Sequence, residues 1–141
     1  MAKTSQPANL LPEKIIANII LAKKYLQAVK FTQQGGAENV RLVIDGAYNT
    51  AEICIKSLLL LKLKEVPKTH GGVVQKFGEY YIKTSLLPKE TGKLSNRMLR
   101  YRNLARYDAQ NKEVENVQIG KESIKFAEQM IKYLEKQMVK L

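Results

Sequence analysis

Residues 38–64 read ENVRLVIDGAYNTAEICIKSLLLLKLK, and their apolar side chains recur at helical spacing on more than one face. A helix that is apolar on several faces is expected to be the central and most buried helix of its fold. The residues expected to point inward are Leu42, Val43, Ile44, Ala47, Ala51, Ile55, Leu58 and Leu59.

Proline and glycine mark the boundaries of further helices on both sides of this stretch. Pro12 suits the opening turn of a first helix, Gly35-Gly36 ends it, and Pro67 ends the central helix. No stretch alternates between apolar and polar residues as a strand would. The expected helices cover residues 12–34, 38–64, 73–84, 88–109 and 117–141. Four long helices with short links favour an all-α fold, an antiparallel up-down four-helix bundle with the short third helix packed across one end.

The chain of 141 residues is expected to form a single domain over residues 1–141, with residues 1–10 as a flexible N-terminal tail. Its longest apolar run is far shorter than the ~20 residues of a membrane span, and the N-terminus carries no apolar signal core. Cys54, the only cysteine, sits in an apolar run and is expected to be a small buried hydrophobe. These features predict a soluble protein of the reducing cytoplasm.

The chain is strongly basic. It has 24 lysines and arginines against 13 acidic residues, a formal net charge of +11. Such a surplus serves either to bind a polyanion or to keep a protein soluble, and charge alone leaves both open.

The stretch from Arg97 to Tyr107 concentrates arginines and tyrosines on the expected fourth helix. A guanidinium is always charged and offers a planar fork of donors that suits phosphate, so this cluster indicates a nucleic-acid or nucleotide contact. The alternative interpretation is a solvated basic face with Tyr107 half buried. The residues expected to face the core are Leu94, Met98, Tyr101 and Ala105. The candidate anion-binding residues of this helix are Arg97, Arg100, Arg102, Asn103, Arg106 and Tyr107.

The spacing within this stretch resembles the R-x4-H-x-Y motif of HEPN domains. Arg100, Ala105 and Tyr107 occupy the three motif positions, while Arg102, Ala105 and Tyr107 fit the R-x-x-A-x-Y form of the UPF0332 branch. Residues 47–51, 68–73 and 86–90 also look like segments of that branch. The resemblance covers roughly residues 40 to 110.

This resemblance implies both a fold and a partner. Such proteins form helical bundles, commonly dimers, in which the arginine-bearing helices of two subunits line a cleft where RNA is bound and, in active members, cut. Many are toxins paired with a small nucleotidyltransferase. The resemblance therefore implies a homodimer whose cleft carries Arg100, Arg102, Asn103 and Tyr107, with RNA or a nucleotide as ligand and no cofactor. Within that cleft, Arg100, Arg102 and Tyr107 are the candidate catalytic residues.

One departure from the motif bears on catalysis. RNA cleavage without a metal needs a base of near-neutral pKa, and Ala105 stands where the motif has histidine. Tyr107 would be a poor proton acceptor, and Arg106 stands where many relatives are expected to carry an acid. Ribonuclease activity is therefore expected to be weak or absent. His70, the only histidine, is expected to hydrogen-bond the backbone at the start of the third helix, with catalysis as the alternative.

Polar residues in the central helix are further candidates. Tyr48 and Asn49 either face the arginine helix as part of the binding site or are satisfied within the core. Asp45 and Glu52 share a face and could pair with the arginines, which would make part of the charge cluster structural. One histidine, one cysteine and no clustered carboxylates make a metal site improbable.

Two functions follow from these observations. The first is a dimeric module that binds RNA or a nucleotide through the arginine helix. The second is an interaction module that docks a nucleotidyltransferase partner. RNA affinity that falls steeply with salt would favour the first, because phosphate contacts release counterions.

Overall fold

The computed structural model describes residues 10–140, and over that range the chain is helical with no strand. The helices are α1 (Leu11–Gln33), α2 (Val40–Leu60), α3 (His70–Phe77), α4 (Lys89–Tyr107) and α5 (Val117–Val139), and the shorter turns are η2 (Gly36–Asn39), η3 (Gly78–Ile82) and η4 (Glu113–Glu115). The all-α prediction is confirmed. The expected N-terminal tail lies outside the described residues except for Leu10. None of the helices described is both long enough and apolar enough to cross a membrane.

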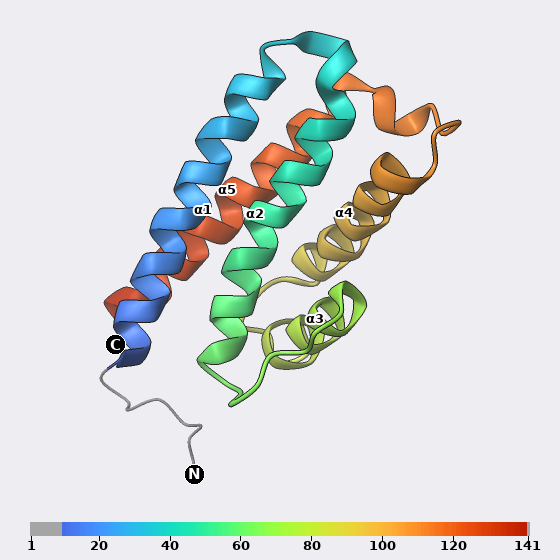
Figure 1. Ribbon diagram of the computed structural model, residues 1–141. Coiled ribbons are helices and arrows are strands. Elements are labelled where there is room, and N and C mark those ends of the chain that lie inside the picture. Colours follow the sequence, from blue (N-terminus) through green and yellow to red (C-terminus); the bar gives the residue numbers. More distant parts are fainter. Residues whose placement is uncertain (1–9, 141) are drawn as a thin grey trace.

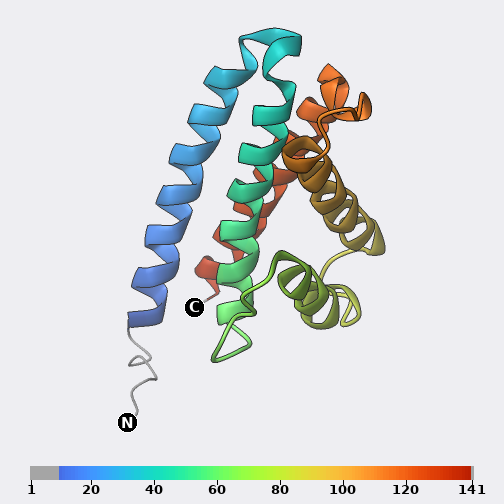
Figure 2. The ribbon, with the colours of Figure 1, turned by 45° about the vertical axis from the view of Figure 1, so that its right-hand side comes forward.

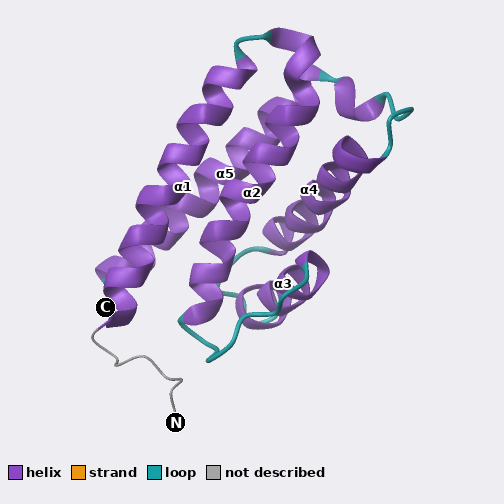
Figure 3. Cartoon of the chain, in the orientation of Figure 1, coloured by secondary structure: helices purple, strands orange, loops and turns teal. Residues whose placement is uncertain are grey.

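The four long helices run alternately up and down (Figure 1). α2 contacts α1, α4 and α5, so it lies at the centre of the bundle. In Figure 2, α1 lies on one side of α2, whereas α3 and α4 lie on its other side. Figure 3 shows that α3 lies near the end where α2 finishes and α4 begins, with short loops joining the elements. This arrangement is the predicted antiparallel bundle with a short helix at one end.

The central position of α2 agrees with its apolar pattern. All but one of the residues expected to point inward are at most 2% exposed, namely Val43, Ile44, Ala47, Ala51, Ile55, Leu58 and Leu59. The exception is Leu42, which is 65% exposed. At 100° per residue, Leu42 shares with Asn49 the narrow face of α2 that points away from the core, so its assignment to the core was wrong.

The third helical segment starts earlier than the sequence predicts. The side-chain oxygen of Thr69 accepts a hydrogen bond from the backbone N–H of Gly72 (2.9 Å), and this N-cap lets α3 begin at His70. Gly71 and Gly72, which precede the expected start at residue 73, therefore lie in the first turn of α3. After Phe77 the chain continues as the wider turn η3.

Candidate functional site

The outward face of α4 carries three of the predicted site residues. The helix starts after Pro88, whose extended backbone serves as the N-cap, and ends at Tyr107. Met98, Tyr101 and Ala105 are buried, as predicted. Arg100, Asn103 and Tyr107 lie exposed on the opposite face, with Tyr107 74% exposed. This exposed face is the part of the predicted site that is open to a ligand.

Two arginines of this helix form ion pairs toward α5 and η4. Arg97 lies 3.5 Å from Glu122, and Arg100 lies 3.4 Å from Glu113. All four side chains are about half exposed. Exposed pairs of this kind contribute little to stability, so a phosphate can compete for either guanidinium. Arg100 also stacks over the ring of Tyr101, with 4.8 Å from its guanidinium carbon to the ring centroid, which holds it in place on the surface.

Arg102 differs from its neighbours because it is buried. The residue is only 4% exposed, its Nε lies 3.4 Å from Asp45 Oδ1 on α2, and its Nη1 donates to Asn103 Oδ1 at 3.0 Å. The resemblance implies that Arg102 lies with Arg100 in an open cleft, and the burial of Arg102 shows that this expectation is wrong. Its guanidinium lies on the side of α4 that packs against α2, where it faces the carboxylate of Asp45 across the junction of the two helices. The expectation that Asp45 pairs with the arginines is confirmed. The same expectation for Glu52 is wrong, because Glu52 pairs with Lys56 and His70.

Arg106 combines features of the exposed Arg100 and the buried Arg102. Its Nε is 3.8 Å from Asp45 Oδ1, the oxygen that Arg102 also faces, and its guanidinium lies near the ring of Tyr107. The side chain is about half exposed. Arg106 therefore borders the exposed face of α4 on its α2 side, as Arg97 does on the α5 side.

Behind this face, α2 and α3 form a polar cluster whose α2 members are buried, while the His70 side chain on α3 is partly exposed. Nδ1 of His70 lies 2.6 Å from Oε2 of Glu52, a residue that is 5% exposed. The ring of His70 meets the ring of Tyr48 edge-on, with 6.2 Å between centroids. The carboxylate accepts from Nδ1–H and so leaves Nε2 of a neutral His70 as an acceptor. His70 thus pairs with Glu52, whereas the predicted bonds to the backbone are made by Thr69.

Tyr48 is the most buried member of this cluster. It is 1% exposed, and its hydroxyl has no hydrogen-bond partner among the described residues. Burial raises the pKa of Tyr48 well above its usual value, the negative charge of Glu52 adds to the rise, and Arg102 opposes it. Tyr48 therefore stays protonated at neutral pH and can donate a hydrogen bond, but it is not a proton acceptor.

Asn49 lies away from the site. Together with Tyr25, Ala28 and Leu42 it lines a shallow pocket between α1 and α2. Since neighbouring positions on a helix point about 100° apart, Asn49 and Tyr48 face different partners. The prediction that both residues belong to a binding site beside the arginine helix is therefore not borne out: Asn49 faces α1, and Tyr48 is buried beside His70 without a hydrogen-bond partner among the described residues.

Sequence reasoning missed Arg41, which caps the C-terminal end of α4. Its guanidinium donates to the carbonyl oxygens of Leu104, Ala105, Asp108, Ala109 and Asn111, and also to the carboxylate of Glu115. The last carbonyls of a helix lack partners within it and favour a cation. Arg41 therefore fixes the end of the arginine helix against α2. Nothing in its local sequence indicates partners more than 60 positions away.

Comparison with known proteins assigns this bundle to a family. The family model of the HEPN domain matches residues 20–137. A Methanocaldococcus jannaschii protein named "Putative toxin MJ0142" is 41% identical over 63 residues, which are 44% of this chain and only 42% of that relative. No solved structure matches the chain. Because the family model covers most of its length, this chain belongs to the HEPN domain family.

Proposed function

We propose that this chain is a toxin-type HEPN module that binds RNA or a nucleotide through the exposed face of α4. The observation that carries the proposal is that Arg100, Asn103 and Tyr107 project from one open face, with Arg97 and Arg106 at its borders. The ion pairs of Arg97 and Arg100 are exposed, so a phosphate can replace either carboxylate. The net charge of +11 favours association with a polyanion, and the likeness to a toxin is in keeping with it.

Cleavage of RNA is expected to be weak or absent. Ala105 is buried on the core side of α4, so the motif position offers neither an acid–base group nor access to a ligand. Tyr48 holds its proton because its pKa is raised. His70 is the only histidine in the sequence, and it is paired with Glu52 on α2. A histidine-based cleavage would therefore have to use His70, and binding is the function that the site supports best.

The proposal includes a homodimer in which the exposed faces of α4 from two copies lie close together. A homodimer that places the α4 faces of two copies around one cleft would double the number of arginines that meet a strand. The UPF0332 branch and the cytoplasmic location remain predictions. The single cysteine is buried and unpaired, which suits a reducing compartment.

A second candidate function is docking of a nucleotidyltransferase partner. The observation that favours it is the set of large apolar side chains exposed along α1, among them Ile16, Ile20, Tyr25 and Phe31. Exposed apolar residues in such number mark protein interaction surfaces when they form a patch. A tight complex with the enzyme, together with no RNA affinity of the isolated chain, would favour this candidate.

The deciding experiment is a fluorescence anisotropy titration with a labelled RNA at several salt concentrations. The Arg100→Gln variant is compared with Lys24→Gln, which removes one exposed charge from α1. We expect Arg100→Gln to weaken binding and to flatten the salt dependence, since it removes a phosphate contact. Equal affinities for the two variants would overturn the assignment of the site to α4.

A further inference from the structure

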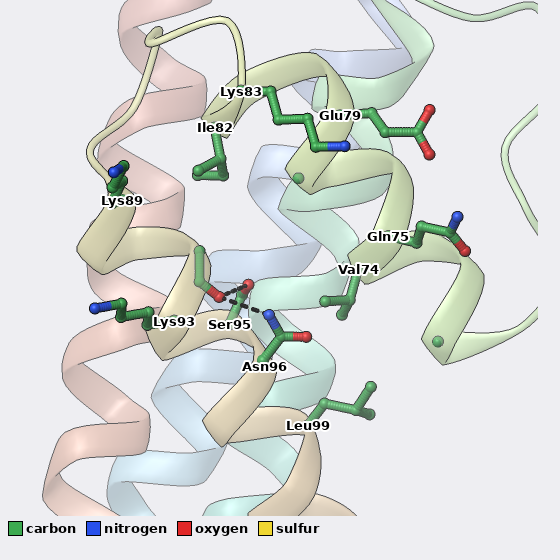
Figure 4. Close-up of a pocket in the computed structure, with 13 residues that line it drawn as sticks. Val74, Gln75, Glu79, Ile82, Lys83, Lys89, Lys93, Ser95, Asn96 and Leu99 are labelled. Carbon is green, nitrogen blue, oxygen red and sulfur yellow. Dashed lines mark hydrogen bonds between the residues drawn. The ribbon is translucent and has the colours of Figure 1, made fainter.

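A groove lies between α3–η3 and the first half of α4, apart from the arginines (Figure 4). Its volume is about 540 Å³, within the range of small-molecule sites. The groove is lined by glycines, apolar side chains, amides and lysines, among them Val74, Gln75, Gly78, Ile82, Lys83, Lys89, Lys93, Asn96 and Leu99. None of these residues belongs to the predicted site.

The floor of the groove is apolar and its edge carries amide groups. Val74, Ile82 and Leu99 lie along the space between the two helical segments (Figure 4). The Nδ2 group of Asn96 donates to the carbonyl of Gly92 at 3.1 Å, which leaves its Oδ1 as an acceptor at the groove. The amide of Gln75 makes no hydrogen bond within residues 10–140. A flat heterocycle on this floor would therefore find hydrogen-bonding groups at its edge.

The charges around the groove are predominantly positive and unpaired. Lys83, Lys89 and Lys93 line it, and none of them lies within ion-pair distance of a carboxylate in the described part of the chain. The carboxylate that lines the groove, Glu79, is already paired with Lys76 at 3.2 Å. The partial positive charge of the α4 N-terminus adds to that of the lysines. This is the charge pattern that suits phosphate groups.

The groove continues into the exposed face of α4. Asn96 lines the groove and lies one helical turn before Arg100, on the same face of the helix. A strand that leaves the groove along this face meets Arg100, Asn103 and Tyr107 in turn. The helical rise places Tyr107 about 16 Å beyond Asn96.

We propose that the groove binds one nucleotide of a single-stranded RNA that lies along α4. Its base rests on Val74, Ile82 and Leu99, and its phosphates face Lys83, Lys89 and Lys93. An unstacked base is available in a single strand but not in a duplex, so single-stranded RNA is the substrate class. This inference rests on the proposed function and extends it to a region that the arginine motif does not include.

The first test removes the charge of the groove. A labelled single-stranded RNA of about 12 nucleotides is titrated by anisotropy against the full chain and against Lys83→Gln/Lys89→Gln/Lys93→Gln. The matched control is Lys14→Gln/Lys24→Gln/Lys132→Gln, which removes three exposed lysines of α1 and α5. We expect the RNA affinity of the groove variant to fall about tenfold. Its plot of log affinity against log salt should become less steep by about 2, and both changes should be smaller in the control. Equal losses in the two triple variants would overturn the inference.

The second test fills the groove and leaves every charge in place. A Cβ added at Gly78 meets no atom within 4 Å, and Gly78 lines the groove, so Gly78→Leu adds bulk there with little strain on the fold. We expect this variant to bind the single strand several-fold more weakly and to lose the preference of the full chain for the single strand over a duplex of the same sequence. An unchanged affinity and an unchanged preference would show that no base enters the groove.

These outcomes separate the inference from the proposed function. Affinity that falls in Arg100→Gln but in neither groove variant overturns the groove inference and leaves the proposed function standing. A chain that binds neither RNA nor AMP overturns both. AMP serves as a mononucleotide probe in the same variants. If AMP binds through the groove lysines and RNA does not bind at all, the placement of a strand along α4 is overturned.

Discussion

Both halves of α4 carry basic side chains, but the surroundings of those side chains differ. In the second half, every arginine from Arg97 to Arg106 faces a carboxylate of its own chain. In the first half, Lys89 and Lys93 face none within the described residues and line a groove. The pairing ranges from buried at Arg102 to exposed at Arg100. A cluster of arginines in a sequence is therefore not by itself a set of free charges, since part of it holds the helix in place.

The largest effect on stability is expected from removing Arg102, and it tests whether this buried arginine stabilises the fold. Replacing Arg102 with Ala leaves Asp45 near the α2–α4 junction with only the more distant Arg106, and we expect a loss of about 3 kcal/mol in the free energy of unfolding. Urea unfolding followed by circular dichroism measures the loss. Arg97→Ala is the matched control, because its ion pair is exposed, and should lose less than about 1 kcal/mol. Similar losses in both variants would remove the distinction between buried and exposed arginines.

The next largest effect is expected from removing Arg41, which attaches the second half of α4 to α2. Arg41→Ala removes the donor to five carbonyls near the end of α4, and we expect a loss of about 2 kcal/mol, reduced from a larger value because water reaches part of this site. Hydrogen exchange should become faster in the last turn of α4 and in residues 108–115. Arg41→Lys keeps the charge but lacks the planar fork, so it should recover only part of the loss. Full recovery by lysine would show that charge alone holds the helix end.

A smaller effect concerns the exposed arginines. Arg100→Gln should lower RNA affinity about fivefold and leave the free energy of unfolding within about 0.5 kcal/mol of the original, because its pair with Glu113 is exposed. Glu113→Gln frees the same guanidinium and should raise RNA affinity slightly. Anisotropy titrations at low salt measure both. Weaker binding by Glu113→Gln would indicate that the carboxylate positions Arg100 for its ligand.

The smallest effect concerns η3, which lines the groove opposite the first half of α4. Gly78 has ordinary helical backbone angles and open space around its missing Cβ, so Gly78→Ala should stabilise the fold by about 0.5 kcal/mol. Thermal unfolding would detect this as a small rise in the melting temperature. A fall instead would show that the wider turn η3 needs glycine at its first position.

The sequence predicts the fold well, because helix periodicity and the placement of proline and glycine are local signals. It predicts Met98, Tyr101 and Ala105 as the buried face of α4 for the same reason. Arg102 shows the limit of that reasoning. Its position borders the buried face, and only the carboxylate of Asp45 on another helix makes its burial possible.

The parts of the site that the sequence does not predict depend on contacts between distant segments. Arg41 meets carbonyls that only the finished bundle brings to it. Lys83 and Lys93 stand on different elements, and no spacing between them indicates a shared groove. His70 shows an intermediate case, since its position at the start of a helix predicts a role in that turn but not a partner on α2.

The contacts of Arg41 also bear on how the chain responds to a break in its backbone. One guanidinium holds carbonyls on both sides of the bend that follows α4, from Leu104 to Asn111, and the carboxylate of Glu115 beyond it. A protease cut within residues 108–111 would therefore separate two fragments whose new ends are still fastened to the same side chain. Such a nicked molecule would keep its shape, and the arginine helix would remain docked without a continuous connection to α5.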